Sequence, residues 1–265
     1  MHIKAFFADI DGTLLNSEHQ MTPATRDILR SCQNRMHMAL VSARSPSGIY
    51  PILLKNNLSM AIVSYNGGWI QDENKNVLYE EGMPAESALE LIAYLEQKIP
   101  SVTWCLYSGD NWIVKTRSDP RVRREEEIVE AFAKEGTPKD ILSLKKTHKV
   151  LCICPEGQAS PVAEELSGQF PSMTIVPSSN MLVEVMVKGI NKANAVRFLC
   201  DYWGVPLREA VAFGDNYNDL EMLMTVGNGV VMGNAPEEMK QSGLYVTPGN
   251  DDDGIEVFLK KYIER

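Results

Sequence analysis

Hydrophobic residues near both ends of the chain alternate between short continuous runs and runs at helical spacing. The continuous runs predict buried strands, whereas a spacing such as that of Ile28, Leu29, Cys32 and Met36 predicts a helix. Strands are expected at residues 3–8, 37–42, 60–64, 210–213, 229–232 and 244–247, and a hairpin at 69–79. Helices are expected between them. Such alternation of strand and helix predicts an α/β fold with a parallel sheet and right-handed crossovers.

The middle of the chain has a different pattern of predicted secondary structure, with more strands for each helix. Strands are expected at about 102–107, 111–116, 148–154, 172–176 and 181–187, and helices at about 88–99, 119–135 and 158–168. This α+β stretch interrupts the alternating pattern. We therefore expect a second domain at 83–187, inserted into a first domain made of residues 1–82 and 188–265.

Composition and charge narrow the class of protein. The chain has 265 residues, of which 44% are hydrophobic and 23% charged, which is typical of a globular protein with a sizeable core. Its net charge of −9 argues against a general nucleic-acid binder and against binding to anionic membranes. No apolar run approaches the ~20 residues of a membrane span, and Asp9 and Asp11 interrupt the first one. We expect a cytoplasmic protein.

The five cysteines support the same expectation. Their number is odd, and Cys152 and Cys154 share one face of a predicted strand, which is poor geometry for a disulfide and only half of a zinc site. Buried, reduced thiols are expected.

Two carboxylates follow the first predicted strand, in Asp9-Ile10-Asp11-Gly12-Thr13. Residues two apart in extended chain share a face, so Asp9 and Asp11 point the same way at the carboxyl end of a parallel strand. They repel each other unless a cation such as Mg²⁺ lies between them. Gly12 and Thr13 form a tight turn whose N–H groups can approach an anion. Alone, the pattern also fits an Asp-capped turn or the metal site of a glycosyltransferase.

A second acidic cluster, between Asp215 and Asp219, follows the predicted strand 210–213. It could cap a helix, but two acidic strand ends in one sheet favour a metal site. Ser42 ends the strand 37–42, where it can donate to an oxyanion or cap the next helix. Lys192 is either a surface charge or a cation beside the carboxylates.

The order of these pieces along the chain resembles the haloacid dehalogenase (HAD) superfamily, and the insertion between Ser42 and Lys192 resembles its members with a C2 cap. Four further segments resemble the Cof-type sugar-phosphatase branch. They are Asn66-Gly67-Gly68, Lys188-Gly189-Ile190-Asn191-Lys192, Val231-Met232-Gly233-Asn234-Ala235 and Asn250-Asp251-Asp252-Asp253-Gly254. The resemblance implies a Rossmann-like core with an inserted cap that acts as a lid.

The resemblance also implies roles for the candidate residues. Asp9 is expected to be the nucleophile that forms an aspartyl phosphate, and Asp11 the general acid and base. The expected ligands of Mg²⁺ are Asp9, the backbone carbonyl of Asp11, Asp215 and Asp219. Ser42, Lys192, Gly12 and Asn218 are expected at the phosphate, with Asn218 also helping to complete the metal site.

The implied substrate is a small phosphorylated metabolite, such as a sugar phosphate, and neither nucleic acid nor membrane is an expected partner. Arg44, Asn66 and Gly67 are candidate substrate contacts. The exact substrate and the oligomeric state stay open. Ala43 and Ala193 stand where the family usually has glycine. We expect activity to survive both changes, although Ala43 would be strained if its φ were positive.

Two other functions are compatible with the same residues. A phosphomutase or phosphotransferase would use the same nucleophile and pass the phosphoryl group to a sugar hydroxyl instead of water. A non-enzymatic phosphoacceptor or sensor would also gather carboxylates, a Ser and a Lys around Mg²⁺. Such signalling domains need neither this chain length nor an inserted domain. Hydrolysis is also commoner than phosphoryl transfer to a sugar in the branch that the chain resembles, so the phosphatase is the leading hypothesis.

Overall fold

The computed structural model describes residues 3–263 of the chain. These residues form two compact units. The first, called the core unit below, contains the chain up to Ala43, Ile49–Tyr79 and the chain from Asn191 onward. The second, called the inserted unit, contains Arg44–Gly48 and Glu80–Ile190.

The core unit is built on an eight-stranded sheet with the order β14-β13-β12-β1-β2-β3-β4-β5. The strands are β1 Ala5–Ala8, β2 His37–Val41, β3 Ala61–Ser64, β4 Trp69–Gln71, β5 Val77–Glu80, β12 Ala210–Gly214, β13 Asn228–Val231 and β14 Tyr245–Val246. The pairs from β14 to β3 are parallel, and β4 runs antiparallel to β3. This agrees with the parallel sheet that the sequence predicts.

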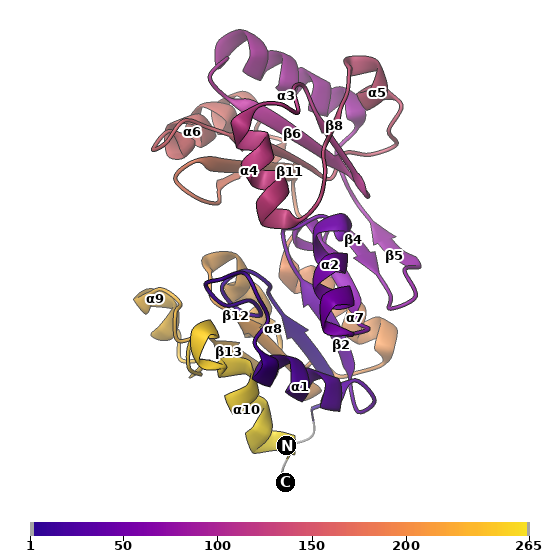
Figure 1. Cartoon of the computed structure of the whole chain (residues 1–265), viewed down its shortest axis with the longest axis vertical. Helices are drawn as coiled ribbons and strands as arrows, with labels where there is room; N and C mark the ends of the chain where they lie inside the picture. The colour runs from indigo at the N-terminus through magenta and orange to yellow at the C-terminus, as the bar shows by residue number, and fades with distance from the viewer. Residues whose placement is uncertain (1–2, 264–265) are drawn as a thin grey trace. The chain divides into compact units, whose positions relative to one another are not determined.

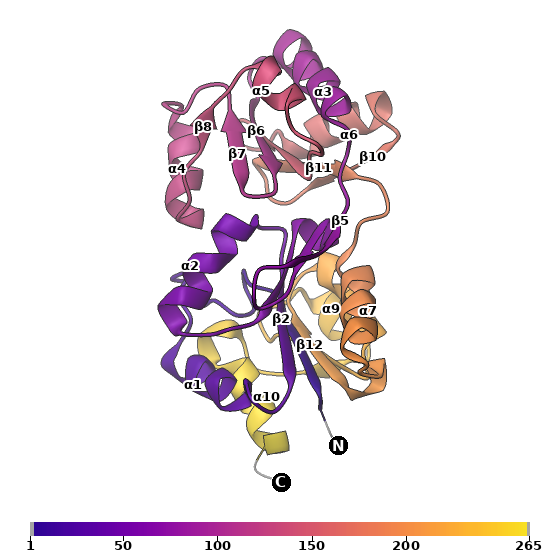
Figure 2. The ribbon, with the colours of Figure 1, turned by 90° about the vertical axis from the view of Figure 1, so that its right-hand side faces the viewer.

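Helices cover both faces of this sheet (Figure 2). They are α1 Pro23–Cys32, α2 Pro46–Asn56, α7 Lys192–Trp203, α8 Leu220–Thr225, α9 Glu237–Lys240 and α10 Gly254–Ile263, with the short 3₁₀ helices η1 Tyr65–Gly67, η2 Leu207–Glu209, η3 Tyr217–Asp219 and η4 Asn250–Asp252. Successive residues of β1 serve opposite faces, as strand geometry requires. Phe6 packs in the cluster that includes α1, α2 and α10, whereas Phe7 packs in the cluster that includes α7 and α8.

The inserted unit has a six-stranded sheet with the order β10-β11-β9-β6-β7-β8, of which β6, β8 and β11 are labelled in Figure 1. Its elements are α3 Ala85–Lys98, β6 Thr103–Ser108, β7 Asn111–Val114, α4 Pro120–Val129, β8 Lys134–Glu135, α5 Pro138–Leu142, β9 Lys149–Ile153, α6 Ala159–Gln169, β10 Met173–Pro177 and β11 Leu182–Val187. All its pairs are antiparallel except β7 with β8. Apolar residues of α3, α6 and the sheet share one hydrophobic cluster.

The helix expected at 119–135 is shorter than predicted. It ends at Val129 because Glu130 adopts a left-handed conformation with φ 51°. The chain then folds back, and the buried carboxylate of Glu126 accepts a hydrogen bond from the Ala133 N–H at 2.8 Å. Helix α5 was not predicted at all, although a capping box between Thr137 and Asp140 supports it.

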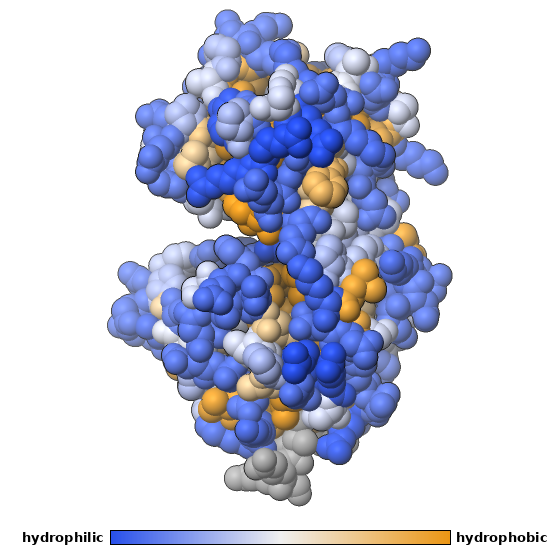
Figure 3. Space-filling model, viewed as in Figure 1, coloured by the Kyte–Doolittle hydropathy of each residue, from blue (hydrophilic) through white to orange (hydrophobic). Residues whose placement is uncertain are grey.

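The surface drawn in Figure 3 is mostly hydrophilic, with small scattered hydrophobic areas. Among the described residues, every helix is too short or too polar to cross a membrane. All five cysteines are buried as free thiols, as expected.

Candidate functional site

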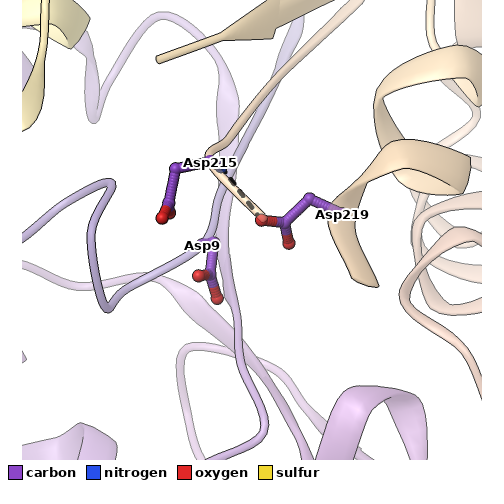
Figure 4. A group of neighbouring side chains, drawn as sticks. All are labelled: Asp9, Asp215 and Asp219. Carbon is purple, nitrogen blue, oxygen red and sulfur yellow. Dashed lines mark hydrogen bonds between the residues drawn. The ribbon is translucent and has the colours of Figure 1, made fainter. Parts of the chain in front are cut away.

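Asp9 and Asp215 are brought together by the pairing of β1 with β12. Ala8 is in register with Phe213, and the Asp9 N–H donates to the Phe213 carbonyl at 3.0 Å. Asp219 lies in η3, just beyond the end of β12. One carboxylate oxygen from each of the three aspartates lies within 4.8 Å of the others. Figure 4 shows the three side chains side by side at the ends of these strands.

The turn after Asp11 fits closely around Asp215. Gly12 has φ 80°, and a Cβ atom there would lie 2.3 Å from Oδ2 of Asp215. Glycine is therefore required both by the conformation and by the lack of space. The buried hydroxyl of Thr13 donates to Oδ1 of Asp215 at 2.5 Å. This turn thus fixes one carboxylate of the cluster.

Asp219 is held by the backbone of its own loop. Its Oδ2 accepts hydrogen bonds from the N–H groups of Asp215 and Asn216, both at 3.0 Å, and the first of these is dashed in Figure 4. A Cβ at Gly214 would lie 2.4 Å from the Cβ of Asp219. The loop therefore packs closely against Asp219. Because the loop N–H groups bond to Oδ2, the other oxygen, Oδ1, can contact Lys192.

Lys192 is the first residue of α7, and Asn191 caps the helix by accepting from the Asn194 N–H at 2.8 Å. The Nζ atom of Lys192 lies 2.7 Å from Oδ1 of Asp9 and 2.6 Å from Oδ1 of Asp219. Its side chain is only 1% exposed. The lysine is therefore a buried cation that binds two carboxylates, and not a surface charge.

Burial is the largest single influence on the pKa values of the site residues, and the neighbouring charges then oppose or add to its effect. Burial raises the pKa of Asp9 well above its ordinary value, and Lys192 only partly opposes this. Burial likewise raises the pKa of Asp215 to about 6, with Thr13 opposing and Asp219 adding to the rise. For Lys192, burial would lower the pKa, but Asp219 and Asp9 outweigh it and the pKa rises. Three clustered carboxylates beside one ammonium group fit a further hard cation with oxygen ligands, such as Mg²⁺.

Ser42 follows β2, the strand next to β1 on the other side. It is 2% exposed, and its backbone is held from both directions: its N–H donates to the Val63 carbonyl and its carbonyl accepts from the Asn66 N–H, each at 2.9 Å. The adjacent Ala43 does not adopt a positive φ. The alanine that replaces the expected glycine is therefore unstrained.

The turn after β3 is strained. Tyr65 and Asn66 both have left-handed conformations, with φ 54° and 55°, and Gly67 has φ 116°. Such conformations in non-glycine residues cost energy and are concentrated at functional sites. A Cβ at Gly67 would lie 2.8 Å from the Asn191 carbonyl, so the turn packs against the start of α7. It thereby connects the Ser42 backbone with the helix that carries Lys192.

Other predicted residues lie outside the cluster. Asp11 and Asn218 are exposed, and the Asp11 carboxylate is not one of the three that lie together. Arg44 belongs to the inserted unit, where its Nη1 donates to the Gly48 carbonyl at 3.3 Å. The hydroxyl contact of Thr13 was not anticipated, because nothing in the sequence places it beside residue 215.

Comparison with known proteins identifies the family of this chain. Residues 6–259 match the family described as haloacid dehalogenase-like hydrolase. The chain belongs to this family. A Haemophilus influenzae protein named a putative phosphatase is 35% identical over 98% of both chains. A Bacillus subtilis protein named 5-amino-6-(5-phospho-D-ribitylamino)uracil phosphatase is 27% identical over 96% of this chain and 95% of that one.

A solved structure supports the same assignment for the whole fold. A haloacid dehalogenase-like hydrolase from Bacteroides thetaiotaomicron superposes with a TM-score of 0.89 at 29% identity, covering 98% of this chain and all of the other. The match includes the inserted α+β unit as well as the core sheet. The chain is thus a HAD-fold enzyme of the phosphatase class.

Proposed function

We propose that this phosphatase hydrolyses small phosphate monoesters through an aspartyl phosphate on Asp9, with Mg²⁺ as its cofactor. The observation that carries the proposal is the contact of Lys192 Nζ with both Asp9 and Asp219 at 2.7 and 2.6 Å. A buried lysine beside a strand-end carboxylate both orients that carboxylate and supplies positive charge for a phosphoryl group.

In the first step, Oδ of Asp9 attacks phosphorus. The bond from phosphorus to the ester oxygen breaks, and Asp11, whose side chain is exposed, gives its proton to the leaving alcohol. Lys192 and Ser42 are proposed to hold the phosphoryl oxygens, where charge increases in the transition state.

In the second step, Asp11 removes a proton from water, and the water oxygen attacks phosphorus of the aspartyl phosphate. The bond from phosphorus to the Asp9 oxygen breaks, which releases inorganic phosphate and restores the Asp9 carboxylate and the protonated carboxyl group of Asp11. The same two aspartates therefore serve both halves of the reaction.

Asp9, Asp215 and Asp219 are the residues proposed to hold Mg²⁺, together with the Asp11 carbonyl. Bound there, the ion would neutralise charge between an anionic nucleophile and an anionic substrate. Burial is the main cause of the raised pKa values of Asp9 and Asp215, and a bound cation would favour the ionised forms of both carboxyl groups.

The substrate class proposed is a phosphorylated sugar or a related small metabolite. The B. subtilis relative is named for a phosphate monoester on a ribityl chain, which supports this class. Asn66 and Gly67 are proposed substrate contacts because their strained turn adjoins Ser42 and α7. We also propose that the enzyme is cytoplasmic, with its five buried thiols reduced.

The test is release of inorganic phosphate by the purified protein with Mg²⁺, across a panel of phosphorylated sugars, sugar alcohols and cofactors. Asp9→Asn should lower turnover by at least about a thousandfold, as expected for a lost nucleophile. Asp27→Asn is the control, because Asp27 is an exposed residue of α1 that pairs with Arg26. Absence of phosphate release with the whole panel, or full turnover by Asp9→Asn, would overturn the proposal.

A further inference from the structure

Two motifs in the C-terminal part of the core unit have no part in the proposed reaction. One is Val231–Ala235, which begins at the last residue of β13, and the other is Asn250–Gly254, which runs from η4 into α10. Both lie far in sequence from the turn that carries Asp11. The structure nevertheless brings them into contact with that turn.

Asn234 bonds to the turn directly. Its Nδ2 donates to the Gly12 carbonyl at 2.8 Å, and its Oδ1 accepts from the Asn250 N–H at 3.1 Å. Two residues earlier, the Met232 N–H donates to the Gly214 carbonyl at 3.0 Å. One short segment therefore contacts the chain beside Asp11 and also the chain beside Asp215.

The second motif holds the continuation of the same turn. Three of its side chains bond to residues between 15 and 22. The contacts are Asn250 Nδ2 to the Leu15 carbonyl at 2.8 Å, the Ser17 N–H to Asp251 Oδ1 at 2.8 Å, and the Thr22 hydroxyl to Asp253 Oδ1. The side chains of this motif thus bond to the chain at three places that follow the turn.

Glycines let the two motifs approach each other. A Cβ at Gly254 would lie 2.1 Å from the Pro248 carbonyl oxygen, and a Cβ at Gly233 would lie 2.8 Å from the Gly249 nitrogen. A side chain at Gly233 would push the two segments apart, and a side chain at Gly254 would open the loop that begins at Pro248. The glycines therefore set the spacing at which Asn234 and Asn250 reach the turn together.

We propose that Asn234 and Asn250 are positioning residues that hold the 11–15 turn in its working geometry. Their two amide groups fix the carbonyls of Gly12 and Leu15, on either side of Thr13 and Leu14. This inference rests on the proposed function, because the turn matters through Asp11.

The two ends of the 11–15 turn differ in burial, and this difference explains why the turn needs restraint near Asp11. Leu14 and Leu15 are buried and anchor one side. Asp11 is exposed, and a general acid must lie within hydrogen-bond reach of its proton acceptor. Misplacement by ~1 Å can cost on the order of 100-fold in rate. Hydrogen bonds to the Gly12 carbonyl restrain the peptide next to Asp11.

The experiment compares Asn234→Ala and Asn250→Ala with Asn228→Ala. Asn228 is the matched control, because its Nδ2 also donates to a backbone carbonyl of the core sheet, that of Ala210 at 3.0 Å, at the opposite end of β12. Steady-state kinetics and amide hydrogen exchange of residues 11–17 are measured for each variant and for the wild type.

Both turn variants should lower kcat by about tenfold or more while KM changes by less than about threefold, a loss typical of residues that orient catalytic groups. Exchange of the 11–17 amides should quicken about three- to tenfold, as expected for one lost hydrogen bond. Asn228→Ala should change neither quantity.

Two results would overturn the inference: unchanged exchange at 11–17 in both turn variants, or an equal loss of kcat in Asn228→Ala. A wild-type protein that released no phosphate would instead refute the proposed function. Hydrogen exchange would then still decide whether the two asparagines hold the turn.

Discussion

The Nζ atom of Lys192 lies 2.7 Å from Oδ1 of Asp9, and the lysine side chain is 1% exposed. A charge buried to this extent is stable only when it is paired, and here the same ammonium group also binds Asp219. The lysine and the two carboxylates therefore depend on one another. Lys192 keeps two carboxylates close together, and the carboxylates keep Lys192 charged.

Replacing Lys192 with Met keeps a long straight side chain and removes the charge. Turnover should fall by at least about a hundredfold, because the cation proposed to bind the phosphoryl group is lost. Without metal, the variant should also lose about 3–5 kcal/mol of unfolding free energy, since Asp9 and Asp219 stay buried without their partner. Phosphate release and urea denaturation measure the two effects.

Lys4→Met provides the comparison for that variant. Lys4 pairs with Glu209 at 2.8 Å near the opposite end of β1, where the lysine side chain is 47% exposed. An exposed pair contributes less than about 1 kcal/mol, so this variant should keep both its stability and its turnover. Equal losses in the two variants would contradict the role given to Lys192.

The positions of Asp9 and Asp215 could be predicted from the sequence because both residues lie at the ends of predicted strands. Apolar runs locate β1 and β12, and parallel pairing then puts Asp9 beside Asp215. Contacts between distant residues could not be predicted in this way. The Thr13 hydroxyl on Asp215 joins positions 202 residues apart, and no local pattern encodes it.

Conformations decided by tertiary contacts were missed for the same reason. Glu130 ends α4 in a left-handed conformation, although its neighbours favour continuing the helix. Tyr65 has φ 54° despite a bulky side chain that disfavours this region. Asn234 and Asn250 were visible as motifs, but only the folded chain shows that they reach Gly12 and Leu15.

Thr13→Val tests whether the Thr13 hydroxyl prepares Asp215 for a metal. Valine has nearly the same shape but cannot donate to Oδ1, so Asp215 loses a hydrogen bond that lowers its pKa. Affinity for Mg²⁺, measured by titration calorimetry, should fall about tenfold. Thr103→Val removes an equivalent hydroxyl bond, to Asp119 at 2.6 Å in the inserted unit, and should leave Mg²⁺ affinity unchanged. A similar affinity for wild type and Thr13→Val would show that the contact is only structural.

Comparison of Asn66→Ala with Asn66→Gly distinguishes the role of the Asn66 amide group from that of the backbone conformation of the strained turn. Both remove the amide, but only alanine is penalised at φ 55°, so Asn66→Ala should be about 1 kcal/mol less stable than Asn66→Gly. If the amide binds substrate, KM should rise in both variants alike. A rise in Asn66→Ala alone would assign the role to the backbone conformation instead.

Ala43→Gly tests the departure from the family pattern beside Ser42. Because Ala43 does not have a positive φ, glycine has no strain to relieve. Turnover should stay within about twofold of the wild type in the phosphate-release assay. A large gain of activity in Ala43→Gly would mean that alanine distorts the loop.

His148 should make the inserted unit sensitive to acid. Burial lowers its pKa from 6.5 to about 4, Lys146 adds to this, and Glu81 opposes it. The Nδ1 atom accepts the Gly109 N–H at 3.0 Å and so cannot take a proton without breaking that bond, although Nε2 faces Glu80 at 3.7 Å. Between pH 6.5 and about 4, His148 is therefore mostly protonated in the unfolded chain and mostly neutral in the folded chain.

The sign of the effect follows from the lowered pKa. The contribution to stability is fully present above pH 6.5 and is lost as the pH falls toward about 4, so denaturation at pH 5 should show a loss of about 2 kcal/mol relative to pH 7.5. His148→Asn, whose Oδ1 can still accept from Gly109, should be less sensitive by that amount. His19→Asn is the control, because His19 is exposed and its φ of 56° suits asparagine. If wild type and His148→Asn lost stability in parallel between these pH values, His148 would not be the group responsible.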